Sequence, residues 1–152
     1  DINCYKVMRF LDKDGQPEPE MWSFRNDMKH FKENKFIVST TFYKNDFKKD
    51  ILINGYITDN NCLVHGSYKY IVVPNKKIGE KLKEILNYDI IAIWLAETMD
   101  NNHLMEFNIG RFPLPENIMD IKDENDFYIN FLNLTDEEIM FIHDFRNNMK
   151  ND

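Results

Sequence analysis

Four histidines are the side chains of this sequence best suited to move protons near neutral pH: His30, His65, His103 and His143. None belongs to an HExxH motif or to a zinc-type combination with a CxxC pair, so their spacing does not indicate a metal site. His65 and His103 lie in two segments that we expect to form strands. Two imidazoles that meet across a sheet can serve as general acid and general base on a phosphodiester. One alternative function is therefore a small metal-independent nuclease or hydrolase that uses His65 and His103.

A short segment carries a dense group of carboxylates: Asp120, Asp123, Glu124 and Asp126. Calcium sites draw several carboxylate oxygens from one loop, and an EF-hand loop has glycine at its sixth position and glutamate at its twelfth. A loop that begins at Asp120 has Asn125 and Phe131 at those positions, so the calcium interpretation fails. The remaining interpretations are a solvated acidic loop and an acidic surface that faces a partner.

Motifs for nucleotide or serine chemistry are missing from the sequence. The five glycines are isolated, and none forms a GxGxxG or GxxxxGK[ST] loop that would cradle phosphates. Ser67 follows a single glycine but lacks the GxSxG pattern of a nucleophile elbow. We therefore expect no cofactor, and we expect that the protein is not an enzyme.

Charge is distributed unevenly along the chain. Residues 87–152 contain 14 acidic and 4 basic residues, whereas residues 1–86 contain 12 acidic and 15 basic residues, so the total of −7 divides into −10 and +3. A surface with an excess of one sign attracts partners of the opposite charge and repels polyanions. The second half therefore favours a basic protein as partner over nucleic acid.

Length and composition indicate one α+β domain over residues 1–152. The chain is long enough to bury a core without disulfide bonds or structural metals, and its 43% hydrophobic and 14% aromatic residues argue against disorder. Its longest apolar run, Ile90–Ala96, is far below the roughly 20 residues that span a bilayer, so we expect no membrane partner. Cys4 and Cys62 form no CxxC pair and predict two reduced, partly buried thiols. The cytoplasm is the expected compartment, and the oligomeric state stays open.

The first half of the sequence predicts a mostly antiparallel sheet. Alternating residues predict a strand over residues 4–11, and β-favouring residues predict strands over 36–43 and 51–58, with Asn54-Gly55 as a turn or a bulge. Residues 62–65 and 68–73 predict a strand pair or a single bulged strand. A helix is expected between residues 21 and 31, because Met21, Phe24, Met28 and Phe31 recur at helical spacing.

Five further elements are predicted, two helices and three strands, and with the helix between residues 21 and 31 they give about three helices. Asn75 is the expected N-cap of a helix over residues 76–86. The continuous apolar run in residues 88–95 predicts a central strand that pairs with a return strand over residues 103–109, and residues 127–132 predict another short strand. Thr135 and Glu138 fit a capping box, and the amphipathic helix that follows should run to about Met149. Its expected apolar face joins six residues: Ile139, Met140, Phe141, Ile142, Phe145 and Met149.

The stretch Tyr70–Leu86, followed by the apolar segments of residues 90–95 and 103–109, resembles immunity proteins of bacterial polymorphic toxin systems. In those families a short helix precedes two hydrophobic strands. The resemblance implies a non-enzymatic, often acidic protein that neutralises a cognate toxin by direct binding. It implies no particular site residues, because such interfaces diverge rapidly.

The leading prediction is thus an acidic protein-binding module of the inhibitor or immunity type, which neutralises a basic partner such as a toxin. The expected acidic surface consists of Glu116, Asp120, Asp123, Glu124 and Asp126. Phe112 and Tyr128 flank this segment and are the candidate aromatic anchors. A third possibility is a phage or mobile-element inhibitor of a host defence protein, which shares this mechanism and differs only in its target.

Overall fold

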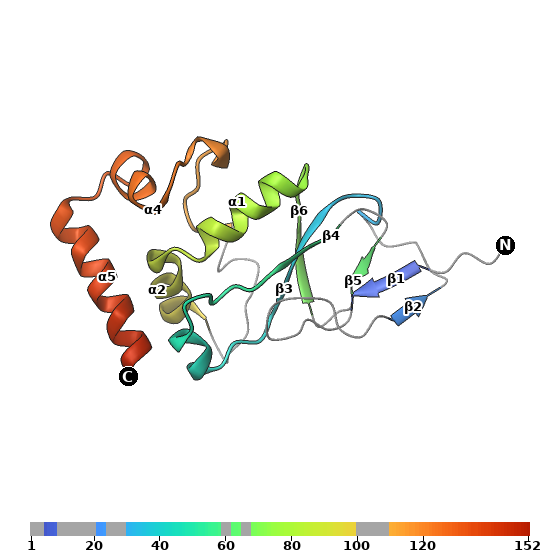
Figure 1. The fold of residues 1–152 in the computed structure, drawn as a ribbon, viewed down its shortest axis with the longest axis horizontal. Helices are drawn as coiled ribbons and strands as arrows, with labels where there is room; N and C mark the ends of the chain where they lie inside the picture. Colours follow the sequence, from blue (N-terminus) through green and yellow to red (C-terminus); the bar gives the residue numbers. More distant parts are fainter. Residues whose placement is uncertain (1–4, 9–20, 24–29, 59–61, 65–67, 100–109) are drawn as a thin grey trace. The chain divides into compact units, whose positions relative to one another are not determined.

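The computed structural model describes residues 5–8, 21–23, 30–58, 62–64, 68–99 and 110–152, and it confirms the α+β class. Contacts divide the chain into two compact units. Unit 1 comprises residues 1–40 and 53–83, and unit 2 comprises residues 41–52 and 84–152. One point of division lies between residues 83 and 84, within a helix (Figure 1). The expectation of one domain for the whole chain stays a prediction.

The described residues of unit 1 form two three-stranded sheets. In the first, β1 (Tyr5–Met8) pairs antiparallel with β2 (Met21–Ser23) and parallel with β5 (Leu63–Val64). In the second, β3 (Lys35–Ser39) lies between β4 (Tyr56–Thr58) and β6 (Tyr68–Val72) and pairs antiparallel with both. The antiparallel pairing of β3 and β6 agrees with the prediction of a mostly antiparallel sheet.

The core of unit 1 surrounds the central strand β3. Phe36 and Ile37 are fully buried, and Gly55, which precedes β4, lies against the ring of Phe36. A Cβ atom at position 55 would lie 2.2 Å from Phe36 Cε2, so glycine is required here by a close approach rather than by a hairpin turn. Cys62 is buried and its thiol donates to the carbonyl of Leu63, while Cys4 lies outside the described residues. The predicted state of the two thiols therefore stays a prediction.

Two helices begin where the sequence predicts. Helix α1 spans Lys76–Leu86, and the Ile78 amide donates to Asn75 Oδ1 at 2.9 Å, which confirms the predicted cap. Helix α5 spans Asp136–Asn151. The Glu138 amide donates to Thr135 Oγ1 while the Thr135 amide donates to the Glu138 carboxylate, as a capping box requires.

Two described segments of unit 2 are helical where the sequence predicted strands. Residues predicted as the central strand form helix α2 (Asp89–Thr98), so that prediction is wrong, and so is the first of the two strands that the resemblance to immunity proteins implies. A short apolar run fits a buried helix as well as a buried strand, and here packing against α5 decides. Residues 127–132 also lack a strand, because Phe127–Phe131 forms one turn of π-helix, η3, after the short helix α4 (Glu124–Asp126).

The helix predicted between residues 21 and 31 begins as strand β2, which pairs with β1 through the partners Lys6 and Trp22. That prediction is wrong for residues 21–23, because hydrogen bonds to a distant strand outweigh local spacing. Residues 24–29 and the predicted return strand over residues 103–109 lie outside the described residues. Among the described residues, no helix is long and apolar enough to cross a membrane.

Candidate functional site

The acidic residues predicted to bind a partner lie on one segment of unit 2, which includes the 3-10 turn η2 (Ile118–Asp120) and helix α4. Glu116, Asp120 and Asp123 are exposed, whereas Glu124 and Asp126 are half-buried. The segment therefore presents acid to solvent, but its five carboxylates are not equally available to a partner.

Two of these carboxylates organise their own loop. Asp123 Oδ1 accepts a hydrogen bond from the Asp126 amide at 2.8 Å and thereby caps α4. Asp126 accepts from the Lys122 amide at 2.9 Å and from the Asn130 side-chain amide at 2.6 Å. The bonds from the Lys122 and Asp126 amides satisfy backbone donors near the start of a short helix, which explains part of the acid density by local structure.

Glu124 has a structural role that reaches across unit 2. Its Oε1 atom accepts a hydrogen bond from the Asp89 amide at 2.8 Å and another from the Tyr128 hydroxyl at 2.5 Å. The Tyr128 oxygen in turn accepts from the Ile90 amide at 3.0 Å. Two orphan amides at the start of α2 are therefore capped by residues 35 and 38 positions further along the chain. A carboxylate at this end also complements the helix dipole.

The two predicted anchors belong to the aromatic core of unit 2. Tyr128 is fully buried, so the prediction that its ring contacts a partner is wrong. Phe112 is half-buried, and its ring packs edge-on to Trp94 at 5.7 Å and tilted against Phe127 at 6.2 Å between centroids. The aromatic residues around the acidic loop thus stabilise unit 2 rather than project from it.

Asp89, Glu124 and His143 bring one potential metal-ligand atom each within 4.8 Å of one another. The Nδ1 atom of His143 hydrogen-bonds Asp89 Oδ2 at 2.6 Å, and the Arg146 Nε atom lies 3.9 Å from Asp89 Oδ1. A guanidinium so close opposes the entry of a further cation, because like charges repel. We therefore interpret this cluster as a hydrogen-bonded network that joins α2, α4 and α5.

Burial gives Tyr88 and Tyr128 raised pKa values, and hydrogen bonds to Glu84 and Glu124, respectively, raise them further. In the unfolded state a tyrosine has a pKa of about 10. Above that pH the unfolded state loses the proton while the folded state keeps it, so the free energy of unfolding falls as the pH rises.

Above a pH of about 10, we expect the free energy of unfolding to fall more steeply in the native protein than in Tyr128→Phe. The two slopes should differ by about 1.4 kcal/mol per pH unit, the contribution of one proton. Urea unfolding at several pH values from 8 to 11.5 measures this difference, and the contributions of other groups cancel in the comparison. Equal slopes in the two proteins would show that the Tyr128 hydroxyl does not stay protonated in the fold.

Helix α5 carries large apolar side chains on its solvent face. Met140 is 63% exposed, Phe141 is 66% exposed and Phe145 is 38% exposed, with the two phenyl rings 6.0 Å apart. The predicted apolar face is correct for Ile139 and Ile142, which are buried, but wrong for these three residues. Exposed aromatic residues at adjacent helix turns are typical of a contact surface.

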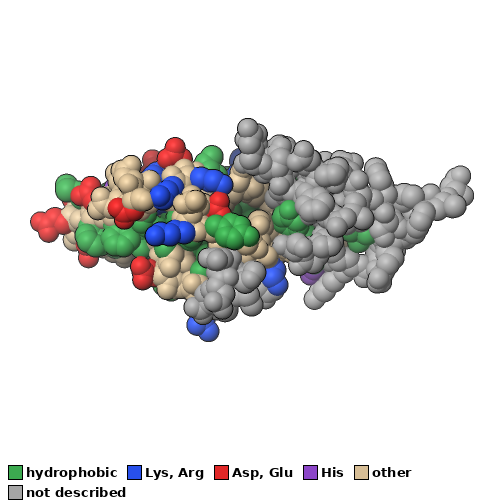
Figure 2. Space-filling model, turned by 90° about the horizontal axis from the view of Figure 1, so that it is seen from below, with side chains coloured by type: hydrophobic (Ala, Val, Ile, Leu, Met, Phe, Trp, Pro, Cys, Tyr) green, Lys and Arg blue, Asp and Glu red, His purple; other side chains and the backbone are tan. Residues whose placement is uncertain are grey.

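Acidic residues lie on the same exposed face of α5. Glu137 and Asp144 precede and follow Phe141 by four and three residues, so all three share one side of the helix. Neither carboxylate forms an ion pair with any residue that the structure describes. Figure 2 shows acidic and hydrophobic side chains exposed side by side on one face of the molecule, with basic side chains among them. We call Glu137, Met140, Phe141, Asp144 and Phe145 the α5 surface.

The α5 surface could have been predicted from the angular positions of the apolar residues around the helix, which the prediction did not use. At 100° per residue, Ile139, Ile142 and Arg146 cluster on one side of the helix, whereas Phe141 lies well over 90° away from that side. The prediction merged two stripes into one because it counted every apolar residue as buried.

His65 and His103, the basis of the alternative enzyme, lie outside the described residues, so that alternative stays a prediction. Comparison of the chain with protein-family models, with curated proteins and with solved structures found no match.

Proposed function

We propose that this chain is a non-enzymatic binding module of the inhibitor or immunity type, and that unit 2 captures a basic protein partner. The observation that carries the proposal is the α5 surface, where the exposed rings of Phe141 and Phe145 lie beside the acidic residues Glu137 and Asp144. Aromatic side chains supply much of the affinity of protein interfaces, while surrounding charges select the partner and speed its approach.

Neutralisation would follow from steric block after electrostatic steering. The −10 net charge of residues 87–152 creates a field that raises the encounter rate with a cationic protein. Exposed acids outside α5, such as Glu116 and Asp120, add to that field without needing direct contact. An inhibitor of a host defence protein, encoded by a phage or mobile element, would work in the same way and differ only in its target.

We expect the double substitution Phe141→Ser with Phe145→Ser to weaken partner binding by at least about 30-fold, the loss of roughly 2 kcal/mol of anchor contacts. The purified protein is used as bait, and the proteins that it captures from the source cell are identified by mass spectrometry. The affinity of the most strongly enriched protein is then measured by interferometry. Tyr43→Ser is the matched control, because Tyr43 is 63% exposed in the same unit but lies outside the α5 surface. Equal loss in the control, or none in the double variant, would contradict the proposed site.

The charges of the α5 surface are tested separately with Glu137→Gln and Asp144→Asn together. Association with the captured partner should slow by about 3-fold to 10-fold and should lose part of its salt dependence, since rim charges act mainly on the association rate. Glu80→Gln removes an exposed acid from unit 1 and should leave the rate unchanged. A captured partner that is itself acidic would overturn the proposal.

A further inference from the structure

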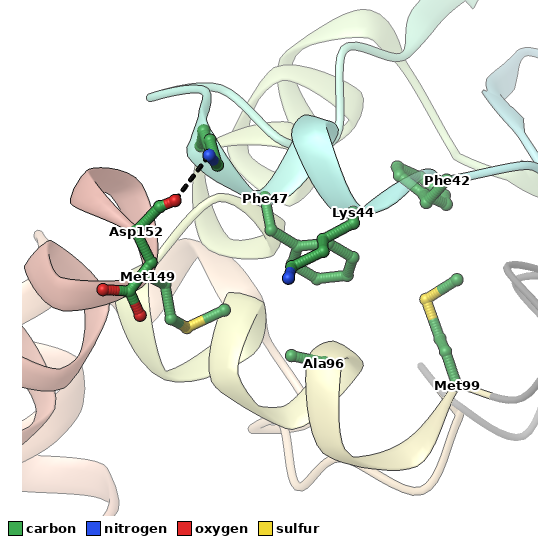
Figure 3. Close-up of a pocket in the computed structure, with 8 residues that line it drawn as sticks. Phe42, Lys44, Phe47, Ala96, Met99, Met149 and Asp152 are labelled. Atoms are coloured by element: carbon green, nitrogen blue, oxygen red, sulfur yellow. Dashed lines mark hydrogen bonds between the residues drawn. The ribbon is translucent and has the colours of Figure 1, made fainter.

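A cavity of about 310 Å³ lies within unit 2, at the lower end of the size range of small-ligand sites. Its walls come from three parts of the chain (Figure 3). The 3-10 segment η1 (Lys44–Lys48) and the preceding Phe42 form one wall, the end of α2 forms the second, and the end of α5 forms the third. Nothing in the proposed capture of a protein partner uses this cavity.

The lining of the cavity is mainly apolar: Phe42, Phe47, Ala96, Met99 and Met149. Figure 3 shows the Phe47 ring and the side chains of Met99 and Met149 directed toward the space between the three walls. Methionine adapts its shape through its rotatable bonds and attracts aromatic rings through its sulfur. Such walls suit a flexible hydrocarbon chain better than a sugar or a nucleotide, which need many polar partners.

Hydrogen bonds hold the walls together before any ligand arrives. The buried Arg146 of α5 donates to the carbonyls of Phe47 and Lys49, the latter at 2.7 Å. Lys150, also on α5, pairs with Asp50 at 2.9 Å. A site whose walls are already in place loses less conformational entropy when it binds.

The polar side of the cavity is cationic. Lys48 already donates to the Asp152 carbonyl at 2.6 Å, whereas Lys44 forms no ion pair with the described residues. In Figure 3 the Lys44 ammonium points into the cavity beside the Phe47 ring, while the Asp152 carboxylate is turned away from it. Lys44 therefore presents a positive charge at the edge of an apolar space.

We propose that this cavity binds a small amphipathic carboxylate. The apolar chain lies against Met99, Met149 and the Phe47 ring, and the carboxylate pairs with the Lys44 ammonium. A neutral alcohol of the same chain length would keep the apolar contacts but lose the ion pair, and an alkylammonium would be repelled by Lys44.

Decanoate, decanol and decylammonium are the probes, and each is titrated into the full chain labelled with ¹³C at the methionine methyl groups. Decanoate and decylammonium are kept below their micelle concentrations, and decanol is kept below its solubility limit. We expect decanoate to shift the methyl signals of Met99 and Met149 and to leave that of Met140, on the α5 surface, unchanged. Decanol should bind at least about 5-fold more weakly, and decylammonium more weakly still. The substitutions Met99→Leu and Met149→Leu assign the two signals.

Substitutions test the ion pair with Lys44 separately from the volume of the cavity. Lys44→Gln should weaken decanoate binding about 5-fold and leave decanol binding unchanged, whereas Lys49→Gln, a neighbouring lysine outside the cavity lining, should change neither. Ala96→Phe, which fills the cavity from the exposed side of α2, should abolish binding of both ligands. The proposal is wrong if decanoate shifts Met140 instead, if decanol binds as tightly as decanoate, or if Lys44→Gln has no effect.

Discussion

Replacing Arg146 by methionine should lower the free energy of unfolding by about 3–5 kcal/mol, the cost of breaking a buried charged pair. Arg146 is only 2% exposed, and its guanidinium donates to the carbonyls of Phe47 and Lys49 while its Nε atom lies 3.9 Å from Asp89. Methionine fills a similar volume but leaves the carbonyls of Phe47 and Lys49 without their donor and removes the positive charge beside Asp89. This one side chain therefore holds the end of η1 to helix α5.

Urea unfolding in a Trp22→Phe background measures this effect, because Trp94 of unit 2 is then the remaining indole. Arg146→Lys should recover only part of the loss, since an ammonium cannot reproduce the planar fork of a guanidinium. Lys150→Met is the matched control on the same helix, and it should cost less than about 1 kcal/mol because the pair with the exposed Asp50 is screened by solvent. A loss in Arg146→Met no greater than that of the control would refute the proposed role of Arg146.

Glu124→Ala should lower the free energy of unfolding by about 2–3 kcal/mol, because it removes the acceptor of two hydrogen bonds at the start of α2. The Asp89 amide and the Tyr128 hydroxyl would both lose a partner in a half-buried site. Glu124→Gln retains an acceptor oxygen without the charge, so we expect an intermediate loss.

Glu116→Ala is the matched control for Glu124→Ala, since Glu116 is an exposed acid of the same segment, and it should change stability by less than about 0.5 kcal/mol. Hydrogen exchange of the Asp89 and Ile90 amides should speed up in Glu124→Ala and stay unchanged in Glu116→Ala. If Glu124→Ala were as stable as the control, the carboxylate would not be the cap of α2. The result also bears on function, because weaker partner binding in Glu124→Ala would then reflect a loosened helix rather than a lost contact.

Local sequence patterns predicted the elements whose N-terminal cap or strand-forming composition depends on neighbouring residues. Helix α1 has its cap at Asn75, and α5 has its capping box at Thr135 and Glu138, so both starts were predicted correctly. Strands β3 and β6 were also predicted, because β-branched and aromatic residues dominate both segments.

The errors arose where partners come from far along the chain. Helix α2 is apolar around most of its surface, so its periodicity carries no helical signal, and its caps come from Glu124 and Tyr128. Strand β2 exists because it pairs with β1, although its apolar spacing fits a helix. In each case a long-range interaction outweighed the local pattern.

For the candidate site, the sequence predicted the excess of acid, but it did not predict which acidic and aromatic side chains are exposed. The charge split is a property of the sequence, and it led directly to the expectation of a basic partner. Which acids and rings are available was decided by folding, which buried Tyr128, used Glu124 as a cap, and left Phe141 and Phe145 in solvent.

The sequence by itself determined the α+β class, the capped starts of α1 and α5, and the acidic character of the second half, because composition and caps act over a few residues. Only the tertiary structure decided that α2 is a helix, which face of α5 meets solvent, and that Arg146 and Glu124 hold distant segments together. The physical reason is that burial and long-range hydrogen bonds depend on which segments meet, and that information is not present in any local pattern.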